Sequence, residues 1–217
     1  MKRSYVVLLT FLFFLCGIGQ SNALTIESTF DTGTEGWTVY NQASLNWSST
    51  GGNPDGYLRF DDSGPDGYGT NAPSKFLGDL SLFDGGYLSF DYRVIRNSPD
   101  PNSGVGTVKF WTSATDYLGL NFIGEPLPTS TDWTTYSKAL TADEWGVDQN
   151  DWMALLSNVT RISIFVEPGG YPDACGLDNV RMFSPASEPV PEPSTIVLMG
   201  LGLVGLAGMG RKKLLKK

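Results

Sequence analysis

Tyr87-Leu-Ser-Phe-Asp-Tyr-Arg-Val94 is the stretch that decides the fold class of this chain. Every second residue from Leu88 to Val94 is apolar, and the residues between them are Ser89, Asp91 and Arg93. Successive side chains of a strand point to opposite faces, so this pattern predicts a β-strand with one buried face. Strands that alternate in this way are typical of antiparallel sheets with one face on a core.

The same alternation recurs on both sides of this segment. Further strands are expected at residues 105–112, 117–123, 133–140 and 161–166. Turn-forming runs of Gly, Pro, Asn and Asp separate them. Residues 151–159 are the one plausible helix, with Asn150 or Asp151 as its N-cap. The sequence therefore predicts an all-β fold, an antiparallel β-sandwich or jelly roll with one short helix.

The C-terminal residues have a different physical character. The triplet Pro191-Glu192-Pro193 is followed by a charge-free apolar run at residues 195–210, and Arg211, Lys212 and Lys213 stop that run. A helix of this length reaches only about 24 Å, short of a ~30 Å hydrocarbon core. The dense cationic end fits a terminus on the cytoplasmic side of a membrane.

This order resembles the PEP-CTERM sorting signal of Gram-negative bacteria that make extracellular polysaccharide. The resemblance rests on Pro191, Glu192 and Pro193, the apolar run and the basic cluster. It implies processing by the membrane enzyme exosortase, with residues 188–217 as the sorting signal and its transmembrane segment. An ordinary C-terminal membrane anchor and a buried helix are the alternatives. Such a signal determines where a protein is sent and implies no biochemical activity.

The N-terminus agrees with export. Lys2 and Arg3 form a positive region, an apolar run follows at residues 6–18, and Ala23 is the small residue expected at a cleavage site. We expect residues 1–23 to be a signal peptide and residues 24–187 to form one domain. The predicted location is the inner membrane during sorting, then the cell envelope, cell surface or extracellular matrix.

Composition excludes several classes of function. The span 24–187 holds 8 Lys and Arg against 21 Asp and Glu, a net charge near −13, which disfavours nucleic acid as a partner. The chain has no histidine, which removes Ser-His-Asp and Cys-His catalysis and the usual zinc sites. Cys175 is the one cysteine of the span, and a buried thiol is favoured over a reactive one.

A second resemblance covers the expected domain. The segments "APSKFLGD" at residues 72–79, "GGYLSFDY" at residues 85–92 and "GLDNV" at residues 176–180 follow one another in the order found in the laminin B (laminin type IV) domain. The similarity spans about residues 30–183. It implies a jelly-roll fold related to carbohydrate-binding modules, without a known catalytic role. The cysteine-rich modules that flank the animal domain are missing, so a matrix role does not carry over.

Jelly rolls similar to this one often hold a structural calcium ion between their first and last strands. The matching positions are Asp31 and Asp178, which we expect to bind Ca²⁺ together. The alternative is that Asp178 only accepts hydrogen bonds from nearby backbone. The acidic turn with Asp61, Asp62 and Asp66 is another oxygen-rich candidate, although it lacks the spacing of an EF-hand.

Six tryptophans in the domain suggest a platform for sugars. Trp37, Trp133 and Trp152 are expected in the core. Trp111 follows the core-like Phe110 and so faces outward, Tyr117 lies across a short turn, and Asn121 shares the face of Tyr117. Trp111, Tyr117 and Asn121 are therefore the candidate glycan-binding residues. Stacking of this kind predicts micromolar-to-millimolar affinity and little salt dependence.

Three classes of function remain open. The sequence favours a non-catalytic, surface-sorted domain that binds glycan or exopolysaccharide. A purely structural component of a biofilm or matrix is the first alternative. A histidine-free glycoside hydrolase is the second, although no pair of carboxylates stands out for that chemistry.

Overall fold

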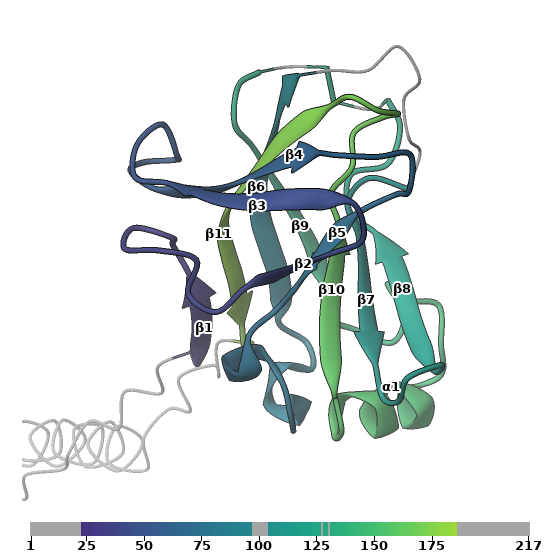
Figure 1. Cartoon of the computed structure of the whole chain (residues 1–217). Coiled ribbons are helices and arrows are strands. Elements are labelled where there is room, and N and C mark those ends of the chain that lie inside the picture. The colour runs from purple at the N-terminus through teal and green to yellow at the C-terminus, as the bar shows by residue number, and fades with distance from the viewer. Residues whose placement is uncertain (1–22, 97–103, 127, 130, 186–217) are drawn as a thin grey trace, which may run out of the picture. The chain divides into compact units, whose positions relative to one another are not determined.

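The computed structural model describes residues 23–96, 104–126, 128–129 and 131–185 (Figure 1). The predicted signal peptide up to residue 22 and the predicted sorting signal from residue 188 lie outside these residues. The described residues fold as two antiparallel sheets that face each other across one core, with a single α-helix at one end. This confirms the predicted antiparallel β-sandwich with one short helix.

The first sheet contains six strands. Its hydrogen-bonded order is β3-β4-β11-β6-β9, and β1 pairs with β11 outside this path. The strands are β1 (Thr25–Ser28), β3 (Ala43–Ser48), β4 (Tyr57–Asp62), β6 (Tyr87–Arg96), β9 (Thr134–Ala139) and β11 (Ala174–Phe183). The strand β11 pairs with β6 along one edge and with β4 and then β1 along the other edge, so β11 is a central strand.

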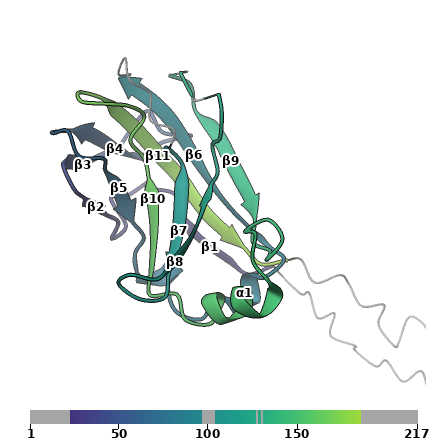
Figure 2. The same cartoon turned by 90° about the vertical axis from the view of Figure 1, so that its right-hand side faces the viewer.

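The second sheet contains five strands in the order β2-β5-β10-β7-β8. They are β2 (Thr38–Tyr40), β5 (Gly69–Asn71), β7 (Thr107–Trp111), β8 (Tyr117–Asn121) and β10 (Arg161–Phe165). Two short 3₁₀ turns, η1 (Ser74–Phe76) and η2 (Ser81–Phe83), link β5 to β6. Figure 2 looks onto the side of the molecule where β7, β8 and β10 lie in front of β11, β6 and β9.

The core lies between the sheets and is rich in aromatic residues. Leu88, Phe90, Tyr92 and Val94 on β6 are all buried, as the alternation predicted. Phe110 on β7 is also buried, at the facing surface of the second sheet. Cys175 on β11 is likewise a buried free thiol, in agreement with the expected apolar role, and burial raises its pKa far above the usual range.

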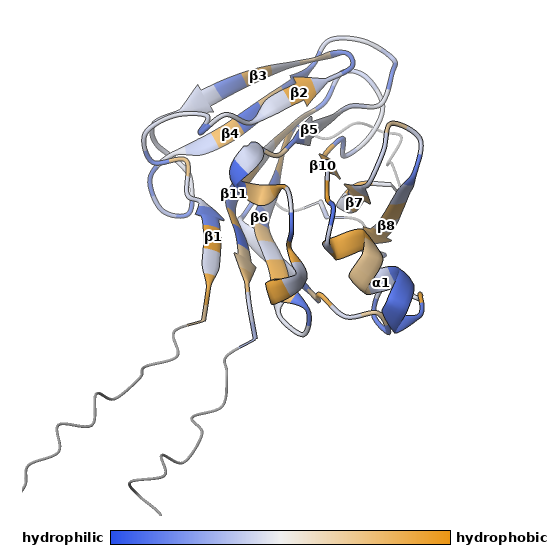
Figure 3. Cartoon of the chain, turned by 90° about the horizontal axis from the view of Figure 1, so that it is seen from below, coloured by the Kyte–Doolittle hydropathy of each residue, from blue (hydrophilic) through white to orange (hydrophobic). Residues whose placement is uncertain are grey.

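The helix α1 (Gln149–Leu156) covers one end of the sandwich. Its N-cap is Asp148, whose side chain accepts hydrogen bonds from the backbone N–H groups of Asn150 and Asp151. The prediction of Asn150 or Asp151 as the cap was therefore wrong by two or three residues. Trp152 is fully buried. Figure 3 shows hydrophilic residues in the first turn of α1 and hydrophobic ones after it.

Within the part of the chain that the structure describes, no helix is long and apolar enough to cross a membrane. The apolar run at residues 195–210, which the sequence assigns to the sorting signal, lies outside that part.

Candidate functional site

The outer face of the five-stranded sheet brings together residues from three adjacent strands. Arg161 on β10 pairs in register with Trp111 on β7, and Trp111 pairs with Tyr117 on β8. The three side chains form a row across the sheet. Trp111 is half-buried and Tyr117 is 46% exposed, so the predicted outward orientation of both residues is found.

A second row lies two residues farther along the strands. It contains Asn71, Ser163, Lys109 and Gly119, one from each of four neighbouring strands. The Trp111 Nε1–H group donates a 3.0 Å hydrogen bond to Ser163 Oγ, which fixes the indole between the rows. A Cβ atom on Gly119 would lie 3.2 Å from Lys109 Cγ, so the glycine leaves room for the lysine stem to lie against the sheet.

Tyr40 on β2 closes the other side of this face. Its hydroxyl lies over Gly69, where an added Cβ would come within 2.2 Å of it. Burial raises the pKa of Tyr40 to about 12, so the phenol stays protonated at neutral pH. A hollow of about 360 Å³ lies among these side chains; its lining residues are Tyr40, Asn41, Asn71, Lys109, Trp111, Arg161 and Ser163.

Two cations lie against the aromatic rings of this face. The guanidinium carbon of Arg161 is 3.8 Å from the centre of the Trp111 ring. The ammonium of Lys109 is 4.3 Å from the Tyr117 ring centre and 5.8 Å from that of Trp111. The two rings also contact each other, at 4.3 Å between centres. We name Lys109, Trp111, Tyr117 and Arg161 the aromatic–cation cluster.

The third predicted residue, Asn121, lies on the same face of β8 but has a structural role. Its Oδ1 atom accepts hydrogen bonds from the backbone N–H groups of Ile123 and Gly124, which shapes the turn after the strand. The sequence therefore placed Asn121 correctly without revealing this use of its side chain. Sequence reasoning missed Lys109 and Arg161, because a lone cation in a strand does not show which ring lies beside it.

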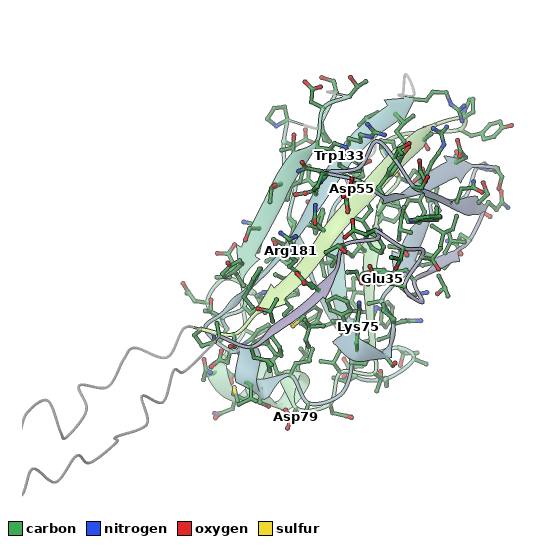
Figure 4. The ribbon with its side chains drawn as sticks, turned by 90° about the vertical axis from the view of Figure 1, so that its left-hand side faces the viewer. Glu35, Asp55, Lys75, Asp79, Trp133 and Arg181 are labelled. Carbon is green, nitrogen blue, oxygen red and sulfur yellow. The ribbon has the colours of Figure 1, made fainter. Side chains whose placement is uncertain are left out.

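A second aromatic–cation contact lies on the outer face of the six-stranded sheet. The guanidinium carbon of Arg93 is 4.6 Å from the ring centres of both Tyr57 and Trp133. Figure 4 shows Trp133 on this side of the molecule. Trp133 is half-buried there, so its expected place in the core was wrong, whereas Trp37 and Trp152 are buried as expected.

The two predicted calcium ligands differ in their surroundings. Asp178 is 1% exposed, and its carboxylate accepts backbone hydrogen bonds from Asn53 and Asn179. Burial raises the pKa of Asp178 to about 6, those bonds lower it, and the charges of Asp91 and Asp31 raise it. Asp31 is exposed and accepts a bond from the Thr29 hydroxyl.

A separate acidic cluster is buried at the ends of three strands. Carboxylate oxygens of Asp62, Glu167 and Asp173 lie within 4.8 Å of one another, in an arrangement that could bind a metal ion. Asp62 Oδ2 is buried and has no hydrogen-bond partner. Burial raises the pKa of Asp173 to about 6, against the hydrogen bonds from Tyr68 and Gly169. The predicted turn of Asp61, Asp62 and Asp66 contributes only Asp62.

Two protein-family models match this sequence. A laminin B (domain IV) model matches residues 70–196, and a PEP-CTERM protein-sorting motif matches residues 189–212, which include Pro191, Glu192 and Pro193. A comparison with curated proteins gives no match.

Three solved structures illustrate the similarity. The L4b domain of human laminin alpha-2 has a TM-score of 0.45 and 14% identity over 55% of this chain and 71% of its own. A family 11 carbohydrate-binding module of a Clostridium thermocellum cellulase has a TM-score of 0.48 and 14% identity, covering 77% and 99% of the chains. An exo-β-agarase has a TM-score of 0.51 and 16% identity, covering 77% of this chain and 26% of its own. The family model covers more than half of the sequence, and the chain therefore belongs to the laminin B (domain IV) family.

Proposed function

We propose that this protein is an exported, non-catalytic domain that binds a polysaccharide on the outer face of the β2-β5-β10-β7-β8 sheet. The observation that carries the proposal is the hollow of about 360 Å³ on that face, lined by aromatic and hydrogen-bonding side chains. Sugar sites need both kinds of group, because rings contact C–H faces and polar groups bond hydroxyls. Tyr40 and Trp111 supply the aromatic lining, and Asn41 and Asn71 supply hydrogen-bonding groups. Tyr117 adjoins the hollow through its contact with Trp111.

The sheet supports the site because it fixes the side chains before a ligand arrives. Trp111, Lys109 and Ser163 come from paired strands, and the Trp111–Ser163 hydrogen bond joins β7 to β10. A preorganised site loses little conformational entropy on binding. A second hollow of about 450 Å³ lies on the side of α1 and is lined in part by Tyr117, so a chain longer than one sugar has space beyond the first hollow.

The sorting motif supports export. It implies processing by exosortase at the inner membrane of a Gram-negative bacterium, with later release to the envelope, the cell surface or the matrix. The expected signal peptide at residues 1–23 fits the same route. On this proposal the domain holds polysaccharide outside the cell.

Catalysis has less support from the described residues. The two carboxyls whose pKa rises to about 6, Asp173 and Asp178, would suit a general acid by this property alone. Both are at most 1% exposed, so a substrate does not reach them in this conformation. Neither Asp173 nor Asp178 is among the described residues that line the hollow on the sheet face.

Calcium at Asp31 and Asp178 remains part of the proposal. The negative charges of Asp91 and Asp31 raise the pKa of Asp178, and a divalent cation would relieve this repulsion. When bound, the ion would connect the turn after β1 to the central strand β11. Its role would be structural, because metal binding to the folded state adds to folding stability.

A binding assay tests the proposed function. Full-length protein in mild detergent is incubated with polysaccharide from the producing strain, and co-sedimentation is measured for the wild type, Trp111→Ala, Tyr117→Ala and Tyr87→Ala. Tyr87 is a matched control, because it is 44% exposed on the other sheet. We expect only the first two variants to lose binding. If no polysaccharide sediments with the wild type, the protein is better described as a structural matrix component.

A further inference from the structure

Only some of the Lys and Arg residues of this domain form ion pairs with carboxylates. The described residues include all eight Lys and Arg of the span 24–187, where 21 acidic residues surround them. Four of the eight form ion pairs; these are Arg59, Lys75, Lys138 and Arg181. Lys109 and Arg161 form no ion pair with a described carboxylate, although carboxylates are in large excess. Their positive charges stay uncompensated on one sheet face.

The same two cations cover ring surface that a neutral sugar would need. Arg161 lies 3.8 Å from the Trp111 ring centre, and Tyr117 contacts the same ring at 4.3 Å between centres. Lys109 lies 4.3 Å from the ring centre of Tyr117. A sugar that stacked flat on Trp111 would have to displace one of these neighbours. The groups that the cluster offers to a ligand are therefore mainly N–H donors with positive charge.

The geometry of these donors fits an anion. The Nε atom of Arg161 is buried without a hydrogen-bond partner among the described residues. A guanidinium presents paired N–H groups that match a carboxylate or a sulfate. Lys109 adds three donors on the next row of the sheet. Asn71 belongs to the same row and lines the hollow, where its amide can bond sugar hydroxyls. The described residues that line this hollow include no carboxylate, and Asp116 lines the separate hollow on the side of α1.

We propose that the aromatic–cation cluster selects anionic polysaccharides, whose sugars carry carboxylate or sulfate groups. This inference rests on the proposed glycan-binding function of the same face. Arg161 binds the acidic group, Lys109 binds a second acidic group or the same one, and Tyr117 contacts the adjoining ring. Since the domain carries a net charge near −13, attraction of this ligand depends on the local cluster and not on overall charge. The sequence-based expectation of little salt dependence is therefore replaced by a marked one.

Matched polymers test the selectivity. Polygalacturonate is compared with its methyl ester, and dextran sulfate with dextran, so that each pair has the same sugar backbone with and without the acidic group. Polyglutamate serves as an anionic polymer without sugars. Binding to the full-length protein in mild detergent is measured by affinity electrophoresis at low and high salt. We expect one or both acidic polymers to bind at least about tenfold more tightly than its neutral partner, about 1.4 kcal/mol. The two pairs distinguish a carboxylate ligand from a sulfate ligand.

Variants connect the selectivity to the cluster. Arg161→Gln and Lys109→Gln should each weaken acidic binding at least about tenfold, whereas Lys109→Arg should retain it. Lys138→Gln removes the same charge from β9 in the other sheet and should leave binding unchanged. Thermal melting of each variant confirms that it is folded.

The possible contrary results are distinct. Equal binding of acidic and neutral polymers, lost in Trp111→Ala, overturns the anion selectivity and leaves the proposed glycan binding intact. Equal binding of polyglutamate overturns the selection of an acidic sugar. If none of the polymers and no polysaccharide of the producing strain binds, both proposals are wrong.

Discussion

The guanidinium of Arg161 lies against the indole of Trp111, with 3.8 Å between the guanidinium carbon and the ring centre. The two residues are register partners on β10 and β7. Their contact is therefore set by strand pairing, which depends on the core side chains of the opposite face. A site built in this way exists before the ligand binds. It also makes the two residues interdependent, so a change in either one alters the environment of the other.

Truncation of Trp111 should separate binding from stability. Trp111→Ala removes a half-buried ring with its contacts to Arg161 and Tyr117, and we expect a loss of about 1–2 kcal/mol in the free energy of unfolding. Trp152→Ala, at a fully buried ring, should cost about 3–5 kcal/mol. Urea unfolding measures both. A loss at Trp111 as large as that at Trp152 would show that the indole is a core element.

Chelation should reveal whether and where a metal stabilises the fold. If Asp31 and Asp178 share an ion, a chelator lowers the melting temperature by several degrees, since a ligand at 100 times its Kd contributes about 2.7 kcal/mol. Asp178→Asn should abolish this sensitivity, and Asp62→Asn should retain it.

The two variants discriminate between the two acidic sites. If Asp62→Asn abolishes the effect of the chelator and Asp178→Asn does not, the ion lies among Asp62, Glu167 and Asp173. A melting curve that the chelator leaves unchanged in the wild type would remove the metal from both sites.

Glu35 should contribute stability that disappears in acid. Burial raises its pKa, but hydrogen bonds from Lys75 and from the Phe30 backbone N–H outweigh burial and bring the pKa below the ordinary value. A carboxyl with a lowered pKa stabilises the folded state above its unfolded pKa, near 4.3, and this stabilisation is lost as the pH falls through the folded pKa.

We therefore expect the stability of the wild type to fall more steeply below about pH 4.3 than that of Glu35→Gln. Near neutral pH, Glu35→Gln should be the less stable protein. It loses the charged bond that holds Phe30, whose φ of 57° is an unfavourable conformation for a residue other than glycine. Urea unfolding between pH 3 and pH 7 measures both effects, and parallel pH profiles would contradict them.

The sorting motif predicts a shortened protein. If exosortase processes the chain near Pro191, Glu192 and Pro193, mass spectrometry of the exported form should find no peptide from residues 211–217. Replacement of Pro191 and Pro193 by alanine should leave the protein in the inner membrane with its C-terminus intact. An exported protein that still contains Arg211, Lys212 and Lys213 would indicate a plain membrane anchor.

The sequence predicted several strands whose two faces differ in polarity, although Ser89 and Asp91 on the polar face of β6 are themselves buried. Residues 87–94 alternate because the outer side chains of β6 avoid the core, and the strand was found there. The central strand β11 escaped prediction as a strand, because nearly all of its residues are buried and no alternation remains. The same limit applies to Trp133, whose burial depends on Arg93 and Tyr57, residues far away in sequence.

The candidate sites were also predicted only in part. Outward placement of Trp111 and Tyr117 followed from the neighbouring core residues, but their cations come from register pairing between separate strands. The acidic turn was visible in the sequence as a local cluster, yet its three carboxylates have different partners in the folded protein. Asp61 pairs with Arg59 and Asp66 bonds Gln42, so only Asp62 joins the buried carboxylates. Local proximity in sequence did not show which oxygen points inward.

The pairing of β1 with β11 has a mechanical consequence. Thr25 is the register partner of Phe183, and Leu24 and Ser184 exchange hydrogen bonds just beyond them, so the chain enters and leaves the domain at one point. If the chain is tethered through its C-terminal residues, as the proposed sorting implies, a pull along the axis of β11 would act perpendicular to the hydrogen bonds of its ladders to β4 and β6. The bonds are then loaded together in shear and not opened one after another. With such a tether, a polymer held on the other sheet would transmit tension through β11, the most extensively paired strand among the described residues.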